Sequence, residues 1–146
     1  MGTPFETDVV VWATEQAVLL RSGQLSALDV EHLAEEIDAM SAKEKRELRN
    51  RLAVLLQHLL KWQFQPIRRS DSWTTAIFEQ RLNINSILED SPSLVPILEQ
   101  RFASAYALAI HQVAKETGIS LHLFPKNCPF TLAESMADGW LPADLH

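Results

Sequence analysis

Leucines that alternate between spacings of four and three residues dominate the middle of the chain. Leu48, Leu52, Leu55, Leu59 and Trp62 follow this pattern, which places all five side chains on one face of an α-helix. Neighbouring apolar residues widen that face. A helix that is apolar over so much of its surface lies between other elements rather than on the outside of a protein. The stretch therefore predicts a central helix with other helices packed around it.

The sequence also marks where this helix is expected to start and stop. Ser41 followed by Glu44 matches a capping box, in which the serine and the glutamate satisfy free backbone N–H groups at a helix start. Pro66 disfavours a helical conformation in the residue before it. We therefore expect this helix to run from Ser41 to about Gln65.

Glycine and proline divide the rest of the chain. Gly23, Gly118 and Gly139 each follow a stretch with helical apolar spacing, and glycine readily adopts the left-handed conformation that ends helices. No strand-like alternation persists anywhere. The other expected helices cover Glu6–Ser22, Ser26–Met40, Trp73–Glu89, a segment from Ser91–Ser93 to Thr117, and a short segment from Thr131 to Gly139. The predicted fold is an all-α single-domain bundle over residues 1–146, with five main helices and a short C-terminal helix around the long third helix.

The composition limits the class of protein. A chain of 146 residues that is 47% hydrophobic and 22% charged is ordinary for a globular domain with one core. Its apolar runs are too short to cross a bilayer, so we expect no membrane association. The single cysteine, Cys128, excludes an internal disulfide and fits a reducing compartment. We therefore expect a cytoplasmic protein.

Charge is distributed in three bands. Residues 1–42 carry eight anions and one cation, residues 43–69 carry eight cations and two anions, and residues 70–146 carry nine anions and four cations. One interpretation is that the acidic band packs beside the basic helix and the charges offset one another internally. The alternative is a nucleic-acid surface along residues 43–69. The acid on both sides of the basic band favours the first interpretation.

Several polar residues fall beside the predicted core. Arg51, His58, Lys61 and Gln65 share one stripe next to the leucine face, and burial there would shift the pKa values of His58 and Lys61. Alternatively, His58 packs at the core edge and Lys61 extends its ammonium to water. The candidate polar cluster comprises Glu31, Glu35, Glu36, Arg51, His58, Lys61, Gln80 and Arg81.

Arg81 interrupts the apolar stripe of its own predicted helix. A guanidinium near a core needs a partner because an unpaired buried charge costs several kcal/mol. We expect Glu35 or Glu36 to be that partner. The same two carboxylates could instead pair with Arg51 or Lys61 across a helix interface.

A metal site has little support in the sequence. His32 and Glu36 are one turn apart and could share a metal, but a third ligand would have to come from elsewhere. His58 is the best outside candidate, and His111 and His122 are alternatives without supporting spacing. We assign no metal and no cofactor.

Arg68 and Arg69 follow Pro66 on an expected turn, between Trp62 and Trp73. Two such arginines could hold a phosphate or carboxylate through paired hydrogen bonds, with the tryptophans as aromatic support. Alternatively, they stabilise the C-terminal end of the central helix, where cations are favoured.

Nucleophilic catalysis has no sequence signature here. No serine is framed by glycines, and Cys128 has only His122 nearby in the sequence. We therefore assign no catalytic residue.

Short motifs are spread over nearly the whole chain. They are Asp29-x-Glu31, Glu35-Glu36-Ile37, His58-Leu-Leu-Lys61-Trp62, Gln65-Pro66, Arg69, Ser72-Trp73, Gln80-Arg81, Ser91-Pro-Ser-Leu94, Phe124-Pro125 and Cys128-Pro129. Together these motifs resemble a bacterial helical family, the domain of unknown function numbered twenty-nine in its series. The resemblance implies an all-helical bacterial protein and implies no activity, substrate or cofactor. His32 stands where the family pattern has asparagine, which weakens a metal site built on His32.

Three functions remain open at this point. The first is a non-enzymatic helical module that binds a partner protein or itself through an exposed apolar patch, for which Trp12, Trp140 and the C-terminal tail are candidates. The second is an enzyme or small-ligand binder in which the polar cluster lines one pocket. The third is a nucleic-acid binder using residues 43–69. We expect the first, with a protein partner or a homo-oligomer.

Overall fold

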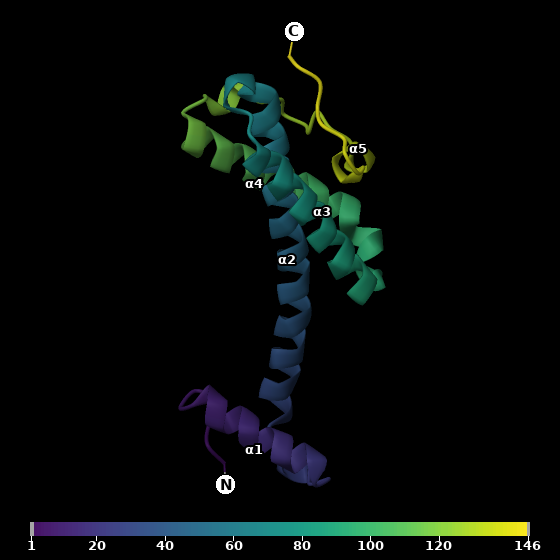
Figure 1. The fold of residues 1–146 in the computed structure, drawn as a ribbon. Coiled ribbons are helices and arrows are strands. Elements are labelled where there is room, and N and C mark those ends of the chain that lie inside the picture. Colours follow the sequence, from purple (N-terminus) through teal and green to yellow (C-terminus); the bar gives the residue numbers. More distant parts are fainter. Residues whose placement is uncertain (1, 146) are drawn as a thin grey trace. The chain divides into compact units, whose positions relative to one another are not determined.

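A computed structural model describes residues 2–145, and across these residues it contains helices and connecting segments but no strand (Figure 1). This confirms the all-α prediction. None of the helices in this range is both long and apolar enough to span a membrane. The α-helices are α1 (Val9–Arg21), α2 (Val30–Phe64), α3 (Asp71–Asp90), α4 (Leu98–Thr117) and α5 (Leu132–Met136), and the 3-10 segments are η1 (Leu25–Ala27), η2 (Pro66–Arg68), η3 (Pro92–Ile97) and η4 (Leu121–Leu123).

The predicted boundary between the second and third helices is wrong. Ser41 and Glu44 lie inside α2, which continues for 35 residues from Val30 to Phe64. The segment around Ser41 contains alanine, methionine, lysine and glutamate and has neither glycine nor proline, so nothing in it stops a helix. A serine followed three residues later by a glutamate is compatible with a helix interior as well as with a helix start.

Several other predicted helix ends are confirmed, but two predicted starts are too early. α1 begins at Val9 and not at Glu6, because Asp8 caps it by accepting hydrogen bonds from the backbone N–H groups of Val10 and Val11, each at 3.1 Å. α4 begins at Leu98, after the 3-10 segment η3, and not at Ser91–Ser93. Gly118 ends α4 in the left-handed conformation, with φ of 77°. Thr131 and Glu134 form the predicted capping box at the start of α5.

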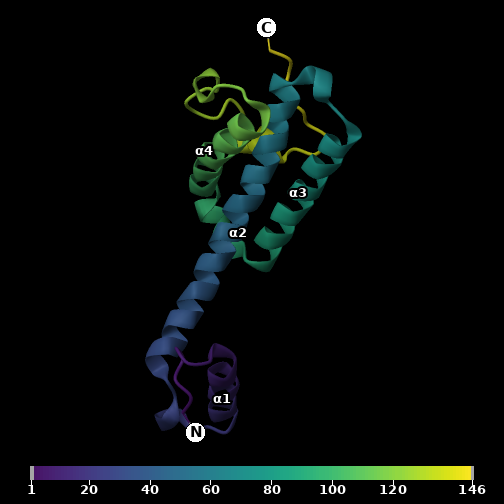
Figure 2. The same cartoon turned by 90° about the vertical axis from the view of Figure 1, so that its left-hand side faces the viewer.

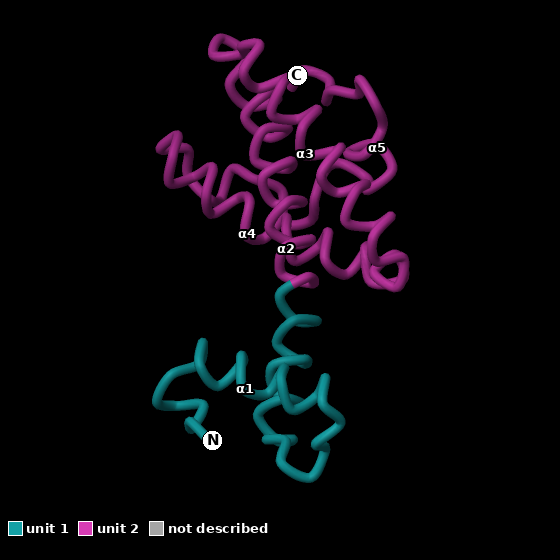
Figure 3. The backbone as a smooth tube through the Cα atoms, turned by 60° about the horizontal axis from the view of Figure 1, so that its bottom comes forward, with its two compact units in different colours: residues 1–43 teal, residues 44–146 magenta. Residues whose placement is uncertain are grey.

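The backbone divides into two compact units, one up to Lys43 and the other from Glu44 onward (Figure 3). Unit 1 holds α1, η1 and the beginning of α2, and unit 2 holds the rest of α2 and all later elements. Each unit is described by itself below. A single domain over residues 1–146 stays a prediction.

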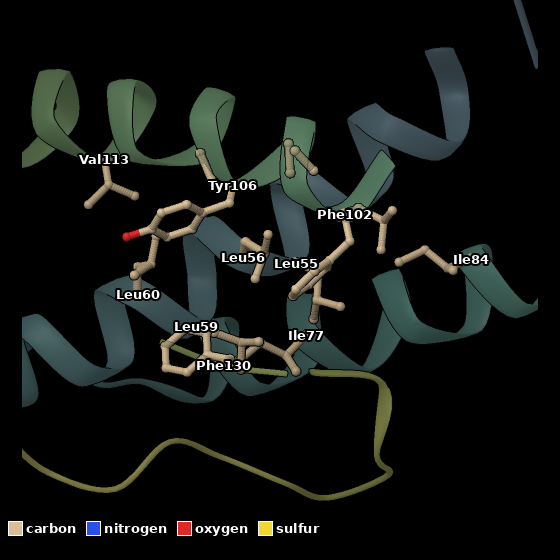
Figure 4. Close-up of a cluster of buried hydrophobic side chains, with 14 of the residues drawn as sticks. Leu55, Leu56, Leu59, Leu60, Ile77, Ile84, Phe102, Tyr106, Val113 and Phe130 are labelled. Atoms are coloured by element: carbon tan, nitrogen blue, oxygen red, sulfur yellow. The ribbon is translucent and has the colours of Figure 1, made fainter. Parts of the chain in front are cut away.

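The core of unit 2 forms around the leucine-rich part of α2, which lies between α3 and α4 (Figure 2). The four leucines of the predicted stripe are completely buried, as are Leu56 and Leu60 on the adjoining face, whereas Trp62 is only partly buried. Ile77 and Ile84 of α3 pack onto this helix, as do Phe102, Tyr106 and Val113 of α4 (Figure 4). Burial on both sides explains why the apolar face of α2 is so wide.

The continuous α2 predicts opposite effects of two alanine substitutions. Ser41→Ala is expected to leave the free energy of unfolding unchanged or to raise it by up to about 0.5 kcal/mol, because alanine is the better interior helix residue. Thr131→Ala is expected to lower it by about 1 kcal/mol, because a true N-cap is removed. Urea unfolding followed by far-UV circular dichroism measures both. A loss at Ser41 as large as the loss at Thr131 would contradict an uninterrupted α2.

Candidate functional site

The eight residues of the predicted polar cluster fall in both units of the structure. Glu31, Glu35 and Glu36 are exposed on the part of α2 that belongs to unit 1. In unit 2, Arg51 donates from Nε to Glu47, one turn earlier on α2, at 2.8 Å. The other four are His58, Lys61, Gln80 and Arg81, of which the last three are buried.

Arg81 is held by backbone carbonyls. Its side chain is only 6% exposed, its Nε donates to the carbonyl oxygen of Ser135 at 2.8 Å, and its Nη2 donates to that of Trp140 at 2.7 Å. The predicted ion pair with Glu35 or Glu36 is therefore wrong. The guanidinium instead fastens α3 to α5 and the segment after it.

Gln80 shares the buried side of α3 with Arg81. Its Oε1 atom is buried without a hydrogen-bond partner among the described residues. Gln80 lines neither of the two pockets described below, so we interpret it as a packing residue.

Lys61 lies at the back of a pocket of about 230 Å³ in unit 2. Its side chain is 9% exposed, and its Nζ atom is 3.1 Å from Oε1 of Glu116 and 5.2 Å from the centre of the Trp73 ring. The alternative in which Lys61 extends its ammonium to water is therefore wrong. The pocket is lined by Lys61, Gln65, Arg68, Trp73, Glu116 and Thr117, which come from the end of α2, from η2, from the start of α3 and from the end of α4.

His58 lies one turn before Lys61 on α2. Its Nδ1 is 2.8 Å from the carbonyl oxygen of Val54, so Nδ1 carries the proton and Nε2 is an acceptor. Burial of the ring and the positive charge of Lys61 lower the pKa of His58, outweighing the Val54 hydrogen bond and the charge of Glu116. His58 is therefore a neutral imidazole at neutral pH.

The two arginines after Pro66 have different roles. Arg69 donates from Nε to the carbonyl oxygen of Trp62 at 2.8 Å, stacks its guanidinium 4.8 Å from the Trp62 ring and pairs with Asp144. Arg69 therefore stabilises the C-terminal end of α2, which is the alternative that we gave to anion binding for this pair of arginines. Arg68 is exposed at the rim of the Lys61 pocket and forms no ion pair within residues 2–145.

Sequence reasoning missed Glu116, the acidic partner of Lys61. No spacing rule connects α4 to α2, because the two residues are 55 positions apart. One signal was available: Glu116 is next to the last residue of α4, where the helix dipole disfavours an anion. An acidic side chain in that place indicates a nearby cation.

Unit 1 has a polar cluster of its own around His32. Its Nδ1 is 2.8 Å from Asp29 and its Nε2 is 3.0 Å from Glu6, while the Trp12 indole also donates to Asp29 at 2.9 Å. Phe5 stacks on the imidazole at 4.7 Å. Since both neighbours of the ring are acceptors, His32 fits this place best as an imidazolium.

The structure does not support the predicted aromatic patch. Trp12 is 3% exposed, and the partly buried Trp140 packs edge-on against Phe130 at 5.6 Å. Both side chains are packing residues within their own units. The exposed apolar side chains of unit 1 are aliphatic instead.

The other candidate ligands and nucleophiles are not brought together. Among residues 2–145, no three His, Cys, Asp or Glu side chains are close enough to share a metal ion, and His111 and His122 are exposed. Cys128 and Tyr106 line a separate pocket of about 370 Å³. Burial raises the pKa of the Cys128 thiol to about 11 and that of the Tyr106 hydroxyl to about 12, so both are protonated at neutral pH.

Comparison with known proteins gives one match. A family model described as "Domain of unknown function DUF29" matches residues 5–141. No match was found among curated proteins or among solved structures.

His58 predicts a loss of stability in mild acid. Its folded-state pKa lies below the ordinary value of 6.5, so the unfolded chain binds more protons between these two values. Stability is therefore lost as the pH falls through about 6.5 toward the folded-state pKa. His58→Leu is expected to reduce this loss, measured as the urea midpoint at a series of pH values. The exposed His111, which makes the same bond to the carbonyl four residues earlier, is the matched control, and an equal effect of His111→Leu would contradict the role of burial.

His32 predicts the opposite pH dependence, a loss of stability of unit 1 as the pH rises. Burial lowers its pKa, but the hydrogen bond and charge of Asp29, followed by those of Glu6, outweigh burial and raise it above 6.5. The contribution that protonated His32 makes to the free energy of unfolding is complete below about pH 6.5 and is lost as the pH rises through the raised pKa. NMR titration of the imidazole is expected to show the raised value. Asp29→Asn should lower it more than Glu6→Gln, and an unchanged titration in Asp29→Asn would contradict the assignment.

Proposed function

The chain belongs to the DUF29 family, whose description assigns no function, and we propose that it acts as a helical interaction module that pairs with a second copy of itself through unit 1 and α2. The observation that carries this proposal is the apolar surface of unit 1. Among residues 2–43 of unit 1, only Trp12, Gln16 and Leu19 are buried, whereas nine large apolar side chains are exposed: Val9, Val10, Val11, Val18, Leu20, Leu25, Val30, Ile37 and Met40.

Because the core of unit 1 is so small, unit 1 needs to bury more apolar surface to be stable. Each fully buried large apolar side chain contributes about 1.5–3 kcal/mol, while ordering a residue costs about 1–2 kcal/mol. A unit of some 43 residues is near the lower limit of what folds without a metal, a disulfide or a partner. Covering the exposed aliphatic side chains with another protein surface supplies the missing burial.

The charges along α2 indicate what that surface is. Glu31, Glu35, Glu36 and Asp38 have no lysine or arginine three or four residues away on the helix and make no ion pair with another described residue. They are followed by the basic segment 43–51, which carries five cations and two anions. A helix that is acidic first and basic later is complementary to an antiparallel copy of itself.

An antiparallel arrangement also matches the apolar side chains. Residues 34–44 are all exposed, and Ile37 and Met40 are 62% and 64% exposed. If Ile37 of one copy faces Met40 of the other, the same register brings Glu36 of one copy beside Lys43 of the other, because both residues flank the Ile37–Met40 face on the same side of the helix. A two-fold axis repeats each contact, so every pair counts twice.

The basic band supports a nucleic-acid function less well. Within residues 43–69, Arg51, Lys61 and Arg69 already pair with carboxylates of the same chain, and phosphate binding uses unpaired cations. We propose the cytoplasm as the location of the module, since the unpaired Cys128 is typical of a reducing compartment.

A charge exchange tests self-association. Glu36→Arg and Lys43→Glu are each expected to raise the Kd of the dimer about tenfold, because each places two like-charged pairs across the interface, at about 1 kcal/mol or more in total. The double variant is expected to recover the parent Kd. Sedimentation equilibrium over a range of protein concentrations measures all four proteins.

Two controls keep this experiment specific. Glu36 and Lys43 are two turns apart on one helix and make no ion pair with each other, so recovery in the double variant has to come from a second copy. Glu79→Arg reverses an exposed charge on α3 and should leave the Kd unchanged. A parent protein that stays monomeric at every concentration, or a double variant as weak as the single ones, would overturn the proposal.

A further inference from the structure

The Lys61 pocket in unit 2 has the composition of a binding site for a small anion. It holds three charged side chains, Lys61, Arg68 and Glu116, which sum to one positive charge. A ligand with one negative charge would neutralise it. This inference is independent of self-association, because it concerns other residues.

The hydrogen-bonding capacity of Lys61 is not used up by its neighbours. Its ammonium has three N–H donors, and its partners among the described residues are the Glu116 carboxylate and the face of Trp73. A buried ammonium is stable only when well paired. An oxyanion in the pocket would complete its coordination.

Arg68 supplies a second donor at the rim. Unlike its neighbour Arg69, its side chain makes no ion pair within the described part of the chain, and it lines the same pocket as Lys61. A planar guanidinium offers two parallel N–H groups to a carboxylate. Lys61 and Arg68 together present donors from the back and from the rim of the pocket.

Size and the aromatic wall define the rest of the ligand. The volume of about 230 Å³ is below that of pockets for drug-sized molecules, about 300–1,000 Å³. Trp73 gives a flat surface on which a planar group can stack, and Gln65 adds an amide. We propose that the pocket binds a small planar monocarboxylate, with its carboxylate between Lys61 and Arg68 and its ring against Trp73.

Benzoate is the probe that tests this proposal. We expect saturable binding in the millimolar range, as for a ligand of this size, measured by isothermal titration calorimetry or ligand-detected NMR. Benzamide has the same shape without the charge and is expected to bind at least tenfold more weakly. Inorganic phosphate, which cannot stack, is expected to compete poorly.

Two variants on the pocket give opposite expectations. Arg68→Gln is expected to weaken benzoate binding at least fivefold with the fold unchanged, because Arg68 is exposed. Glu116→Gln is expected to strengthen it several-fold, because the pocket then carries two positive charges. A purely structural Lys61–Glu116 pair would give no such gain.

Arg21→Gln is the matched control, since Arg21 is an exposed arginine on α1 and its loss should leave benzoate binding unchanged. The proposal is overturned by any of three results: no saturable binding of benzoate, equal binding of benzamide, or an Arg68→Gln variant that binds benzoate like the parent.

Discussion

The architecture of unit 2 depends on one constraint: the leucine-rich part of α2 has to be covered on two sides. Six leucines between Leu48 and Leu60 are completely inaccessible to solvent, and each contributes about 1.5–3 kcal/mol through burial. Water on either side would forfeit much of this free energy. The positions of α3 and α4 on opposite sides of the helix follow directly, as does the burial of Phe102 and Tyr106 of α4 against it.

The same packing decides how buried cations are accommodated. Lys61 continues the inaccessible side of α2 and meets a carboxylate and an aromatic face. Arg81 meets two backbone carbonyls. In each case the cost of removing a cation from water is offset by polar groups of a later segment. These cations therefore link elements that are distant in the sequence, and only one of the two lies beside an open pocket with a further unpaired cation.

Local sequence signals predicted the helices well and the long-range partners poorly. The spacing of Leu48 to Trp62, the proline after Gln65, the glycine after Thr117 and the Thr131–Glu134 box all reflect interactions within a few residues, and each was interpreted correctly. The prediction of a helix start at Ser41–Glu44 was wrong because the same local pattern suits a helix interior. The partners of Arg81 and Lys61 were predicted wrongly because they depend on tertiary packing. Arg81 binds backbone carbonyls, and Lys61 binds a carboxylate 55 residues away. Lys61 and Arg68 were nevertheless singled out by their positions, since cations beside an apolar face or after a helix end need partners wherever the chain finds them.

The segment after α5 has a consequence for the order of folding during synthesis. Trp140 accepts from Arg81, Ala143 accepts from Gln63, and Asp144 pairs with Arg69, so residues 140–144 fasten parts of α2, η2 and α3 that were made much earlier. Translation adds about 5–20 residues per second, whereas helices form in about a microsecond. α2, α3 and α4 are therefore synthesised roughly one second or more before these contacts can form. During that interval the Arg81 guanidinium lacks the Trp140 carbonyl, so α3 gains this contact only after the whole of α4 has been made.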